Sequence, residues 1–436
     1  MGTSEYRRDG DDRSVVELTR ALVGQESPSN REGGVARIVA DRMRELGYDD
    51  VHVDAMGNVV GLIKGTGPAG PTDPASILFD GHMDTIGVTP RNAWHRDPFG
   101  GQIEGSRLYG RGASDMKGAI AAMVEGIGRL ARQGGAVGSG GSDESGAPRR
   151  PAADIWVVAS VAEEMMEGVA LTHVLDEIPA RTGRPRPANI VIGEATGLAV
   201  ATGQRGRAEL VVETLGVPAH SSTPHLGVNC VYSMTEAVQA LRRLAPPEHA
   251  WLGAGVMELT DIISTPYPAT SVVPDRCAVT YDRRTLAGET APSVLRPVEE
   301  ALSRLAAADP HFKASVRLAE ASFETYTGHP VRATKFLDAW LTPHDSALAR
   351  AAQAGLDWAG VAAGAADARF SSYKFCTNGS AIGGKPGYSI IGFGPGNEVQ
   401  AHTIDEFIEI DQLTAAARGY LGLALAVAFP AAIAVR

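Results

Sequence analysis

Residues 77–84 read Ile-Leu-Phe-Asp-Gly-His-Met-Asp, a pattern typical of an α/β sheet with a site at its edge. The apolar run predicts a buried strand. His82 would leave that strand at its carboxyl end, where open α/β sheets place their sites. A neutral imidazole is a good zinc ligand, and Asp84 could bond to its second ring nitrogen and fix the tautomer. A solvated turn with an incidental histidine is the alternative interpretation.

Two more apolar runs also end in acids. Residues 155–164 read Ile-Trp-Val-Val-Ala-Ser-Val-Ala-Glu-Glu, and residues 190–194 read Ile-Val-Ile-Gly-Glu. Adjacent Glu163 and Glu164 at a buried strand end repel each other unless a cation or a proton lies between them. One of them could therefore bind a metal ion while the other accepts a proton. Glu194 repeats the pattern, although polar strand ends are also common in ordinary sheets.

An aspartate and a histidine occur in glycine-rich loops. Residues 110–119 read Gly-Arg-Gly-Ala-Ser-Asp-Met-Lys-Gly-Ala, and the glycines would allow the backbone to pass close to a ligand. The two oxygens of Asp115 could bridge two cations, or Asp115 could only cap the following helix. His402 follows the turn at residues 394–396 and precedes an acidic pair, Asp405 and Glu406.

Each of these segments is a weak signal alone, but their order resembles that of a zinc-dependent family. This family includes acetylornithine deacetylase, succinyl-diaminopimelate desuccinylase, aminoacylase and carboxypeptidase G, and the resemblance extends from about residue 77 to about residue 406. It implies a metal-dependent hydrolase with two Zn²⁺ ions, which mixed nitrogen and oxygen ligands would also allow to be Co²⁺ or Mn²⁺. It implies that Glu163 is the general base and that Asp84 lies behind a ligand. The implied ligands are His82, Asp115, Glu164, Glu194 and His402, with Asp115 shared by both ions.

The length of 436 residues predicts two domains. Residues 199–321 have the pattern strand, helix, strand, strand, helix, strand, which is the ferredoxin-like order. The predicted fold class is therefore α/β, with a di-zinc aminopeptidase-like catalytic domain formed by residues 1–198 and 322–436. A ferredoxin-like (βαββαβ) lid formed by residues 199–321 would be inserted into it. The family often uses this lid for dimer contacts, so the resemblance implies a homodimer.

The predicted lid contains three candidate site residues. By resemblance, His220 would polarise the scissile carbonyl, commonly in the active site of the partner subunit, and so stabilise developing negative charge. Asn229 would help to orient the substrate. Arg284 would meet a substrate carboxylate, which a guanidinium fits geometrically. The alternatives are an ordinary loop histidine for His220 and a surface salt bridge for Arg284.

Residues 374–380, Lys-Phe-Cys-Thr-Asn-Gly-Ser, depart from the family pattern. Many family members carry a Gly-Thr-Asp-type stretch here, so the change would alter the polarity of the pocket. We expect Asn378 to take part in substrate binding. Cys376 has no histidine marked as its partner, and a packed or pocket-lining thiol is the better interpretation.

Composition limits the remaining possibilities. The formal charge is −11 without a notable basic run, which argues against a nucleic-acid partner. Three cysteines form no disulfide framework and fit a reducing cytoplasm. The chain starts without an apolar signal core, and residues 421–435 are too short and alanine-rich to predict a membrane span. Residues 134–153 are rich in glycine, serine and proline and predict a surface insertion.

Two features favour an acylated amino acid as the substrate. By resemblance, aminopeptidase-like branches tend to have aspartate at the position of Glu194, and Arg284 suggests a carboxylate close to the scissile amide. We therefore expect hydrolysis of an amide bond near a carboxylate, of the N-acyl amino acid deacylase type. The alternatives are a dipeptidase or carboxypeptidase, a biosynthetic enzyme acting on an unusual amide or lactam, and a member that binds without catalysis.

Overall fold

The computed structural model describes residues 11–67, 76–134, 150–361 and 369–429. Most of the predicted insertion at residues 134–153 lies outside the described residues. The larger sheet has the strand order β1-β2-β6-β3-β7-β20-β8-β18, and β19 pairs with β8. Its strands are β1 (Asp50–Val53), β2 (Val59–Ile63), β3 (Ile77–His82), β6 (Ile155–Ser160), β7 (Asn189–Ile192), β8 (Val200–Gln204), β18 (Trp340–Leu341), β19 (Phe370–Tyr373) and β20 (Ser389–Gly392).

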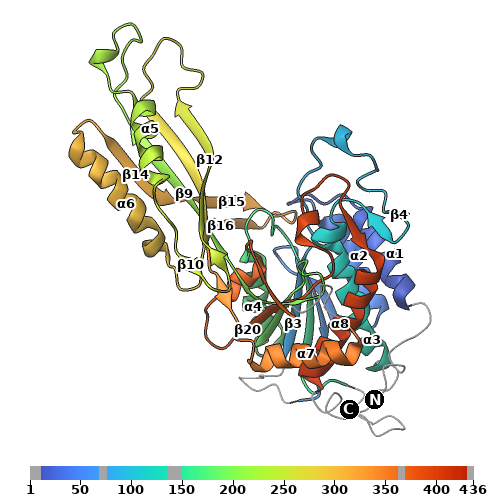
Figure 1. Ribbon diagram of the computed structural model, residues 1–436. Helices are drawn as coiled ribbons and strands as arrows, with labels where there is room; N and C mark the ends of the chain where they lie inside the picture. Colours follow the sequence, from blue (N-terminus) through green and yellow to red (C-terminus); the bar gives the residue numbers. More distant parts are fainter. Residues whose placement is uncertain (1–10, 68–75, 135–149, 362–368, 430–436) are drawn as a thin grey trace.

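The four central strands of this sheet are parallel. β3 pairs in parallel with both β6 and β7, and β20 pairs in parallel with β7. The hairpin of β1 and β2 joins this core through an antiparallel pairing of β2 with β6. Because the four strands run the same way, all of their carboxyl ends lie at one edge of the sheet (Figure 1).

Helices cover both faces of the larger sheet, as its alternating side chains require. Ile77 and Phe79 of β3 pack into a core shared with five helices, whereas Leu78 packs on the opposite face with α4. This three-layer arrangement buries the parallel strands on both sides (Figure 1). The helices are α1 (Asp11–Val23), α2 (Gly33–Glu45), α3 (Gly118–Gly134), α7 (Ala347–Ala359) and α8 (Ile410–Ala428) on the first face, and α4 (Val169–Thr182) on the second.

A second, antiparallel sheet projects from the first and forms what we call the arm, residues 206–318 (Figure 1). Its strand order β12-β13-β9-β14 is the ferredoxin-like arrangement that the sequence predicts. Buried and partly exposed side chains alternate along β9 and β13, and the two helices pack on the buried face. The elements are β9 (Gly206–Leu215), α5 (Cys230–Leu241), β12 (Val256–Thr265), β13 (Arg276–Thr285), α6 (Ala291–Ala308) and β14 (Lys313–Leu318).

Short elements connect these two units and complete the fold. A hairpin of β15 and β16 follows the arm, and β17 pairs with β9 at the base of the arm. The short strands are β4 (Gln102–Glu104), β5 (Arg107–Tyr109), β10 (Glu248–His249), β11 (Gly253–Ala254), β15 (Glu320–Glu324), β16 (Pro330–Thr334), β17 (Phe336–Leu337) and β21 (Phe407–Glu409). The short helices are η2 (Arg91–Ala93), η3 (Ala113–Lys117), η4 (Pro224–Leu226), η5 (Asn378–Ile382) and η6 (Glu398–Gln400).

The predicted fold class is confirmed by this architecture, whereas the exact domain boundaries remain a prediction. No helix in the described part of the chain combines the length and the apolar character that crossing a membrane requires.

Candidate metal centre

Three of the parallel strands deliver acid or histidine side chains to the same edge of the larger sheet. His82 is the last residue of β3, Glu163 and Glu164 follow β6, and Glu194 follows β7. β3 and β6 are fully buried, and β7 is buried except for its first residue, so their packing fixes where each chain leaves the sheet. Residues that are far apart in the sequence therefore lie close together at this edge.

The loop that carries Asp115 is held by a buried carboxylate that the sequence analysis did not single out. Glu406 accepts hydrogen bonds from the backbone N–H groups of Gly112 (3.1 Å), Ser114 (2.8 Å) and Asp115 (3.0 Å). Arg111 donates to the same carboxylate at 2.7 Å. Because these contacts fix the backbone from Gly112 to Asp115, Glu406 is a positioning residue for the Asp115 carboxylate.

The loop that carries His402 follows β20 and lies against the end of β7. A Cβ atom at Gly394 would lie 2.2 Å from the carbonyl oxygen of Gly193 and 2.5 Å from that of Glu194, so only glycine allows this approach. His402 itself has a φ of +64°, in the left-handed region that a non-glycine residue adopts only at a cost. Such backbone strain is concentrated at functional sites.

Asp115 lies between two histidines, and each oxygen of its carboxylate faces a different one. Its Oδ1 is 3.0 Å from His82 Nε2, and its Oδ2 is 3.4 Å from His402 Nε2. Glu194 Oε1 is 3.2 Å from His82 Nε2, and Glu164 Oε1 is 3.1 Å from His402 Nε2. The arrangement is therefore two histidine–carboxylate pairs that share one aspartate, which is the donor set of two adjacent divalent cations.

The electrostatics of this cluster also fit bound cations. Burial and the neighbouring Asp115 raise the pKa of Glu194 to about 7. Hydrogen bonds to Asp115 and Glu164 raise the pKa of His402 to about 10. Among the described residues, the ion pairs of these carboxylates are with His82 and His402 alone. Carboxylates therefore outnumber the cationic partners, and divalent cations would remove the excess of negative charge.

Glu163 lies beside this donor set without completing either pair. Its Oε2 is 4.0 Å from His82 Nε2, and its side chain is buried. Burial and the nearby Glu194 raise its pKa well above the usual range, although His82 opposes the shift. The preceding Ala162 has a φ of +55° and donates its N–H to Glu32 at 3.1 Å. These contacts hold the backbone just before Glu163, whose carboxylate lies next to the cluster.

Asp84 lies behind His82, although not in the manner that the sequence suggests. The atom nearest to His82 Nδ1 is the carbonyl oxygen of Asp84 at 2.9 Å, and the Asp84 carboxylate is 3.5 Å away. That carboxylate accepts instead from the backbone N–H groups of Glu163 and Glu164, both at 3.1 Å, and from Ser29. Asp84 therefore connects His82 to the segment that carries both glutamates.

His220 and Asn229 lie at the far end of the arm. β9 starts at the base of the arm and reaches the tip at Leu215, and both residues lie in the loop and cap that follow. Ten residues of strand at about 3.3 Å each separate them from the base by roughly 30 Å. His220 is exposed, and its Nδ1 accepts from Ser222 N–H at 3.1 Å. Asn229 caps α5 by accepting from Val231 N–H at 2.9 Å.

Arg284 lies at the base of the arm. It donates to Asp282 at 2.7 Å, and Asp282 also accepts from Arg207 at 3.0 Å. Arg207 in turn donates to Glu167 at 3.1 Å, and Glu167 follows Glu164 by three residues. This ion-pair chain places the Arg284 guanidinium near the segment of the metal centre and gives it a defined orientation.

The Asn378 side chain is buried behind the strand ends and is hydrogen-bonded to neighbouring residues. Both hydrogens of its amide are used, because Nδ2 donates to Asp80 Oδ2 and to Ser160 Oγ, each at 2.9 Å. Its Oδ1 accepts from Gly168 N–H at 2.8 Å. These contacts hold the Asn378 side chain in the framework, and its predicted contact with substrate stays a prediction. Cys376 is buried, which raises the pKa of its thiol well above the usual range and fits the predicted packed thiol.

The sequence of the chain also matches known proteins. A family model described as peptidase family M20/M25/M40 matches residues 78–426. The chain is 31% identical to a succinyl-diaminopimelate desuccinylase of Cereibacter sphaeroides (strain KD131) over 299 residues, covering 67% of this chain and 73% of that protein. It is 29% identical to the uncharacterized protein YgeY of Escherichia coli (strain K12) over 415 residues, covering 94% of each chain.

Solved structures show the same fold at low sequence identity. The M20 family metallo-carboxypeptidase Sso-CP2 of Sulfolobus solfataricus matches with a TM-score of 0.69 at 16% identity, covering 97% of this chain and 100% of that one. Human carnosine dipeptidase 1 matches with a TM-score of 0.67 at 15% identity, covering 96% and 97% of the two chains.

Proposed function

The chain belongs to peptidase family M20/M25/M40 and is a metal-dependent hydrolase of that family, and from this premise we propose that it cleaves an amide bond close to a carboxylate. The substrate class would be small N-acyl amino acids. The observation that supports this most is the shared Asp115, which faces His82 and His402 with separate oxygens while Glu163 lies alongside.

Two Zn²⁺ ions are the cations that we propose for this centre. His82, Glu194 and one oxygen of Asp115 would hold the first, and Glu164, His402 and the other oxygen of Asp115 would hold the second. Imidazole and carboxylate donors suit Zn²⁺, and they also accept Co²⁺ or Mn²⁺. The chemistry supplied by cations bound there is polarisation of the scissile carbonyl and a lowered pKa of the attacking water.

Glu163 would act as the general base. Its carboxylate would accept a proton from the attacking water and deliver it to the leaving nitrogen. Its burial and its position 4.0 Å from His82 support this role. Asp84 would keep Glu163 in place by accepting its backbone N–H. Arg284 would bind the substrate carboxylate, supported by its position at the base of the arm.

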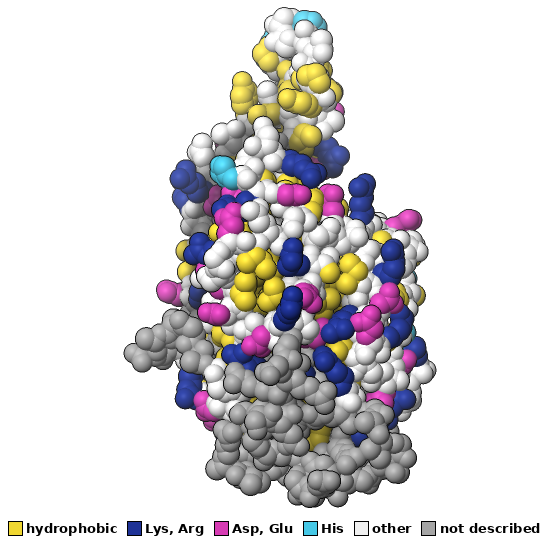
Figure 2. Space-filling view, turned by 90° about the vertical axis from the view of Figure 1, so that its right-hand side faces the viewer, with side chains coloured by type: hydrophobic (Ala, Val, Ile, Leu, Met, Phe, Trp, Pro, Cys, Tyr) yellow, Lys and Arg dark blue, Asp and Glu magenta, His cyan; other side chains and the backbone are white. Residues whose placement is uncertain are grey.

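We also propose a homodimer formed through the arms. Large apolar side chains are exposed along the edge strand β12 and at the tip, and Figure 2 shows hydrophobic side chains gathered over this narrow end. An unpaired edge strand is a ready surface for a second chain. In such a dimer, His220 would reach the partner's metal centre and stabilise negative charge on the carbonyl oxygen, with Asn229 nearby. The apolar residues are Leu226, Tyr232, Val256, Ile262, Ile263 and Tyr267.

The cytoplasm is the location that we propose, because all three cysteines are free and buried, as in proteins of a reducing compartment.

The decisive test is Glu163→Gln, assayed on a panel of N-acyl amino acids and dipeptides with the metal content measured in parallel. We expect the wild type to hydrolyse N-acyl amino acids in preference to dipeptides. The variant should keep its metal while kcat falls roughly 10²–10⁴-fold, the usual contribution of a general base. Unchanged kcat would overturn the base assignment, and a preference for dipeptides would favour the dipeptidase alternative. A wild type that binds zinc without any turnover would indicate a binding protein.

A further inference from the structure

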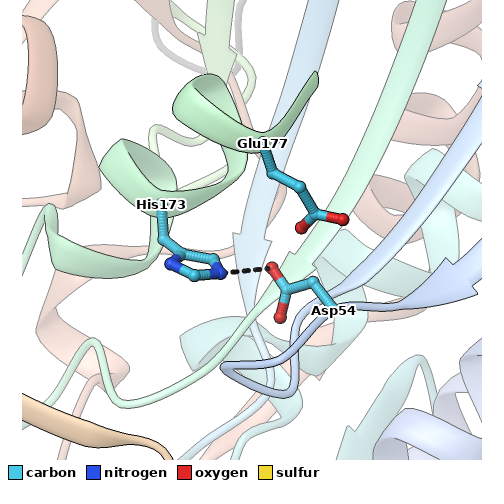
Figure 3. A group of neighbouring side chains, drawn as sticks. All are labelled: Asp54, His173 and Glu177. Atoms are coloured by element: carbon cyan, nitrogen blue, oxygen red, sulfur yellow. Dashed lines mark ion pairs between the residues drawn. The ribbon is translucent and has the colours of Figure 1, made fainter. Parts of the chain in front are cut away.

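A second group of metal-ligand side chains lies away from the candidate metal centre. Asp54 follows β1 in the turn of the β1–β2 hairpin, and His173 and Glu177 are four residues apart on α4, so they share one face of that helix. The three side chains point toward one another (Figure 3). One ligand atom from each lies within 4.8 Å of the other two.

The spacing of Asp54 and His173 suits a shared cation better than a direct hydrogen bond. Asp54 Oδ2 and His173 Nε2 are 3.8 Å apart, which is too long for a hydrogen bond. Two ligands at 2.0–2.2 Å from one zinc ion are about 3.4 Å apart in tetrahedral geometry. Asp54 is already fixed in place, because its Oδ1 accepts from the N–H groups of Gly57 (2.8 Å) and Asn58 (2.9 Å). The Asp54 carboxylate is therefore a rigid, buried group that could bind a metal ion.

Glu177 supplies a carboxylate oxygen that lacks a partner. Its Oε1 is 3.3 Å from His52 Nε2, whereas its Oε2 is buried and has no hydrogen-bond partner among the described residues. Leaving a buried charged oxygen unpaired is costly. Arg181 forms an ion pair with the other oxygen, since its Nε is 3.9 Å from Glu177 Oε1, while its Nη1 donates to Asp50 (2.9 Å) and to His52 Nδ1 (2.8 Å). A cation between Glu177 and Asp54 would satisfy the unpaired oxygen and remove the repulsion between the two carboxylates.

We propose that Asp54 Oδ2, His173 Nε2 and Glu177 Oε2 form a further binding site for one divalent transition-metal cation, with Zn²⁺ as the best fit. An imidazole together with two carboxylates favours Zn²⁺ over Mg²⁺ and Ca²⁺, which prefer oxygen ligands only. Three protein ligands leave a position for water. His173 also lines a surface cavity of about 460 Å³, which gives its imidazole access to solvent.

Such a cation would be structural and would stabilise the segment that carries the proposed base. Asn58 donates to Asp54 at 2.8 Å and accepts from the N–H of Val161 at 3.0 Å, two residues before Glu163. The helix that carries His173 begins shortly after Glu164. A cation bound by Asp54 and by this helix would therefore connect the chain before Glu163 to the chain after Glu164.

The test counts bound cations. The full-length protein would be stripped with a chelator and titrated with Zn²⁺ alone, and bound zinc would be measured by equilibrium dialysis with elemental analysis. We expect His173→Ala and Glu177→Gln each to bind one Zn²⁺ fewer per chain than the wild type. His311→Ala and Glu299→Gln, the same exchanges at exposed positions on the arm, should bind as much as the wild type. The readout is a difference between variants, so it does not depend on how many cations the Asp115 centre holds.

A second measurement separates the two sites. In an Asp115→Ala background, Zn²⁺ should still raise the melting temperature, because ligands that bind the folded state stabilise it. Adding His173→Ala to that background should make the increase smaller, by the contribution of this one site. Equal zinc binding by the wild type, His173→Ala and Glu177→Gln would overturn the proposal and identify the cluster as a plain ion pair of His173 with Asp54. Loss of zinc from Asp115→Ala alone would concern the proposed function and leave this site intact.

Discussion

The edge of the larger sheet and the tip of the arm both carry predicted site residues, but only those at the sheet edge lie together as a group. At the sheet edge, three strand ends and two loops bring five ligand residues together, with Asp115 between the two histidines. At the tip, the His220 side chain is exposed, and its ring bonds to Ser222 of the same loop. A centre of the first kind needs nothing but its own chain and cations. Residues of the second kind require another surface, which the proposed partner subunit would supply.

The largest effect is expected for Asp115→Asn, which tests whether the sheet edge is complete. The amide has one oxygen instead of two and carries no charge, so it cannot bridge two cations. We expect loss of at least one bound zinc ion and activity reduced to background. Metal content and kcat would be measured together, with the exposed Asp97→Asn as the control. If Asp115→Asn bound as much zinc as the wild type, Asp115 would not be the shared ligand, and the contrast between the sheet edge and the tip would fail.

The next effect tests whether the tip acts on another chain. We expect His220→Ala to lower kcat about 10²–10³-fold, the usual effect of removing one donor to an oxyanion, with bound zinc unchanged.

Mixing inactive His220→Ala with inactive Glu163→Gln sharpens this test. Subunit exchange would create one intact site in each mixed dimer, which restores roughly a quarter of wild-type activity if His220 acts on the partner and dimers form at random. Absence of any recovery despite verified exchange would show that His220 does not work across the interface.

An intermediate effect is expected for Ile263→Asp on the exposed edge strand β12. Its side chain is 56% exposed in the single chain, and a buried carboxylate would oppose association of two arms. We expect a monomer by light scattering and activity lowered toward that of His220→Ala. Ile103→Asp, at a similarly exposed position on β4, should leave the oligomeric state unchanged.

The smallest effect is expected for Asn378→Ala, which tests the framework behind the sheet edge. The substitution removes three hydrogen bonds and leaves Asp80, Ser160 and Gly168 without this partner. We expect the free energy of unfolding to fall by about 1–3 kcal/mol, measured by urea denaturation, with KM little changed. Gln102→Ala, an exposed amide on β4, serves as the control. A large rise in KM with unchanged stability would restore the substrate-binding role.

The sequence predicts best those features that depend on local order. An apolar run followed by His82, by Glu163 and Glu164, or by Glu194 predicts strands whose ends share one edge, and β3, β6 and β7 have this arrangement. The ferredoxin-like order of the arm follows from alternation in the same way.

Roles that depend on distant contacts could not be predicted from local pattern. The hydrogen bond of Asn378 to Asp80 joins residues 298 positions apart, and nothing near Asn378 indicates it. Glu406 was visible only as part of an acidic pair, and its three backbone contacts to the Asp115 loop have no local signature. Asp84 presents its carbonyl oxygen to His82, because backbone geometry after the strand, rather than residue type, sets which atom is nearest.

The hydrogen bonds that the Asp115 loop donates to Glu406 have a consequence for biosynthesis. Asp115 is synthesised 291 residues before Glu406, and His402 emerges only just ahead of that glutamate. A nascent chain that already contains the remaining donors therefore lacks both the second histidine and the carboxylate that orders the bridging aspartate. A chain that stops before residue 402 would therefore lack part of the proposed metal site, and the Asp115 loop in it would lack its hydrogen bonds to Glu406.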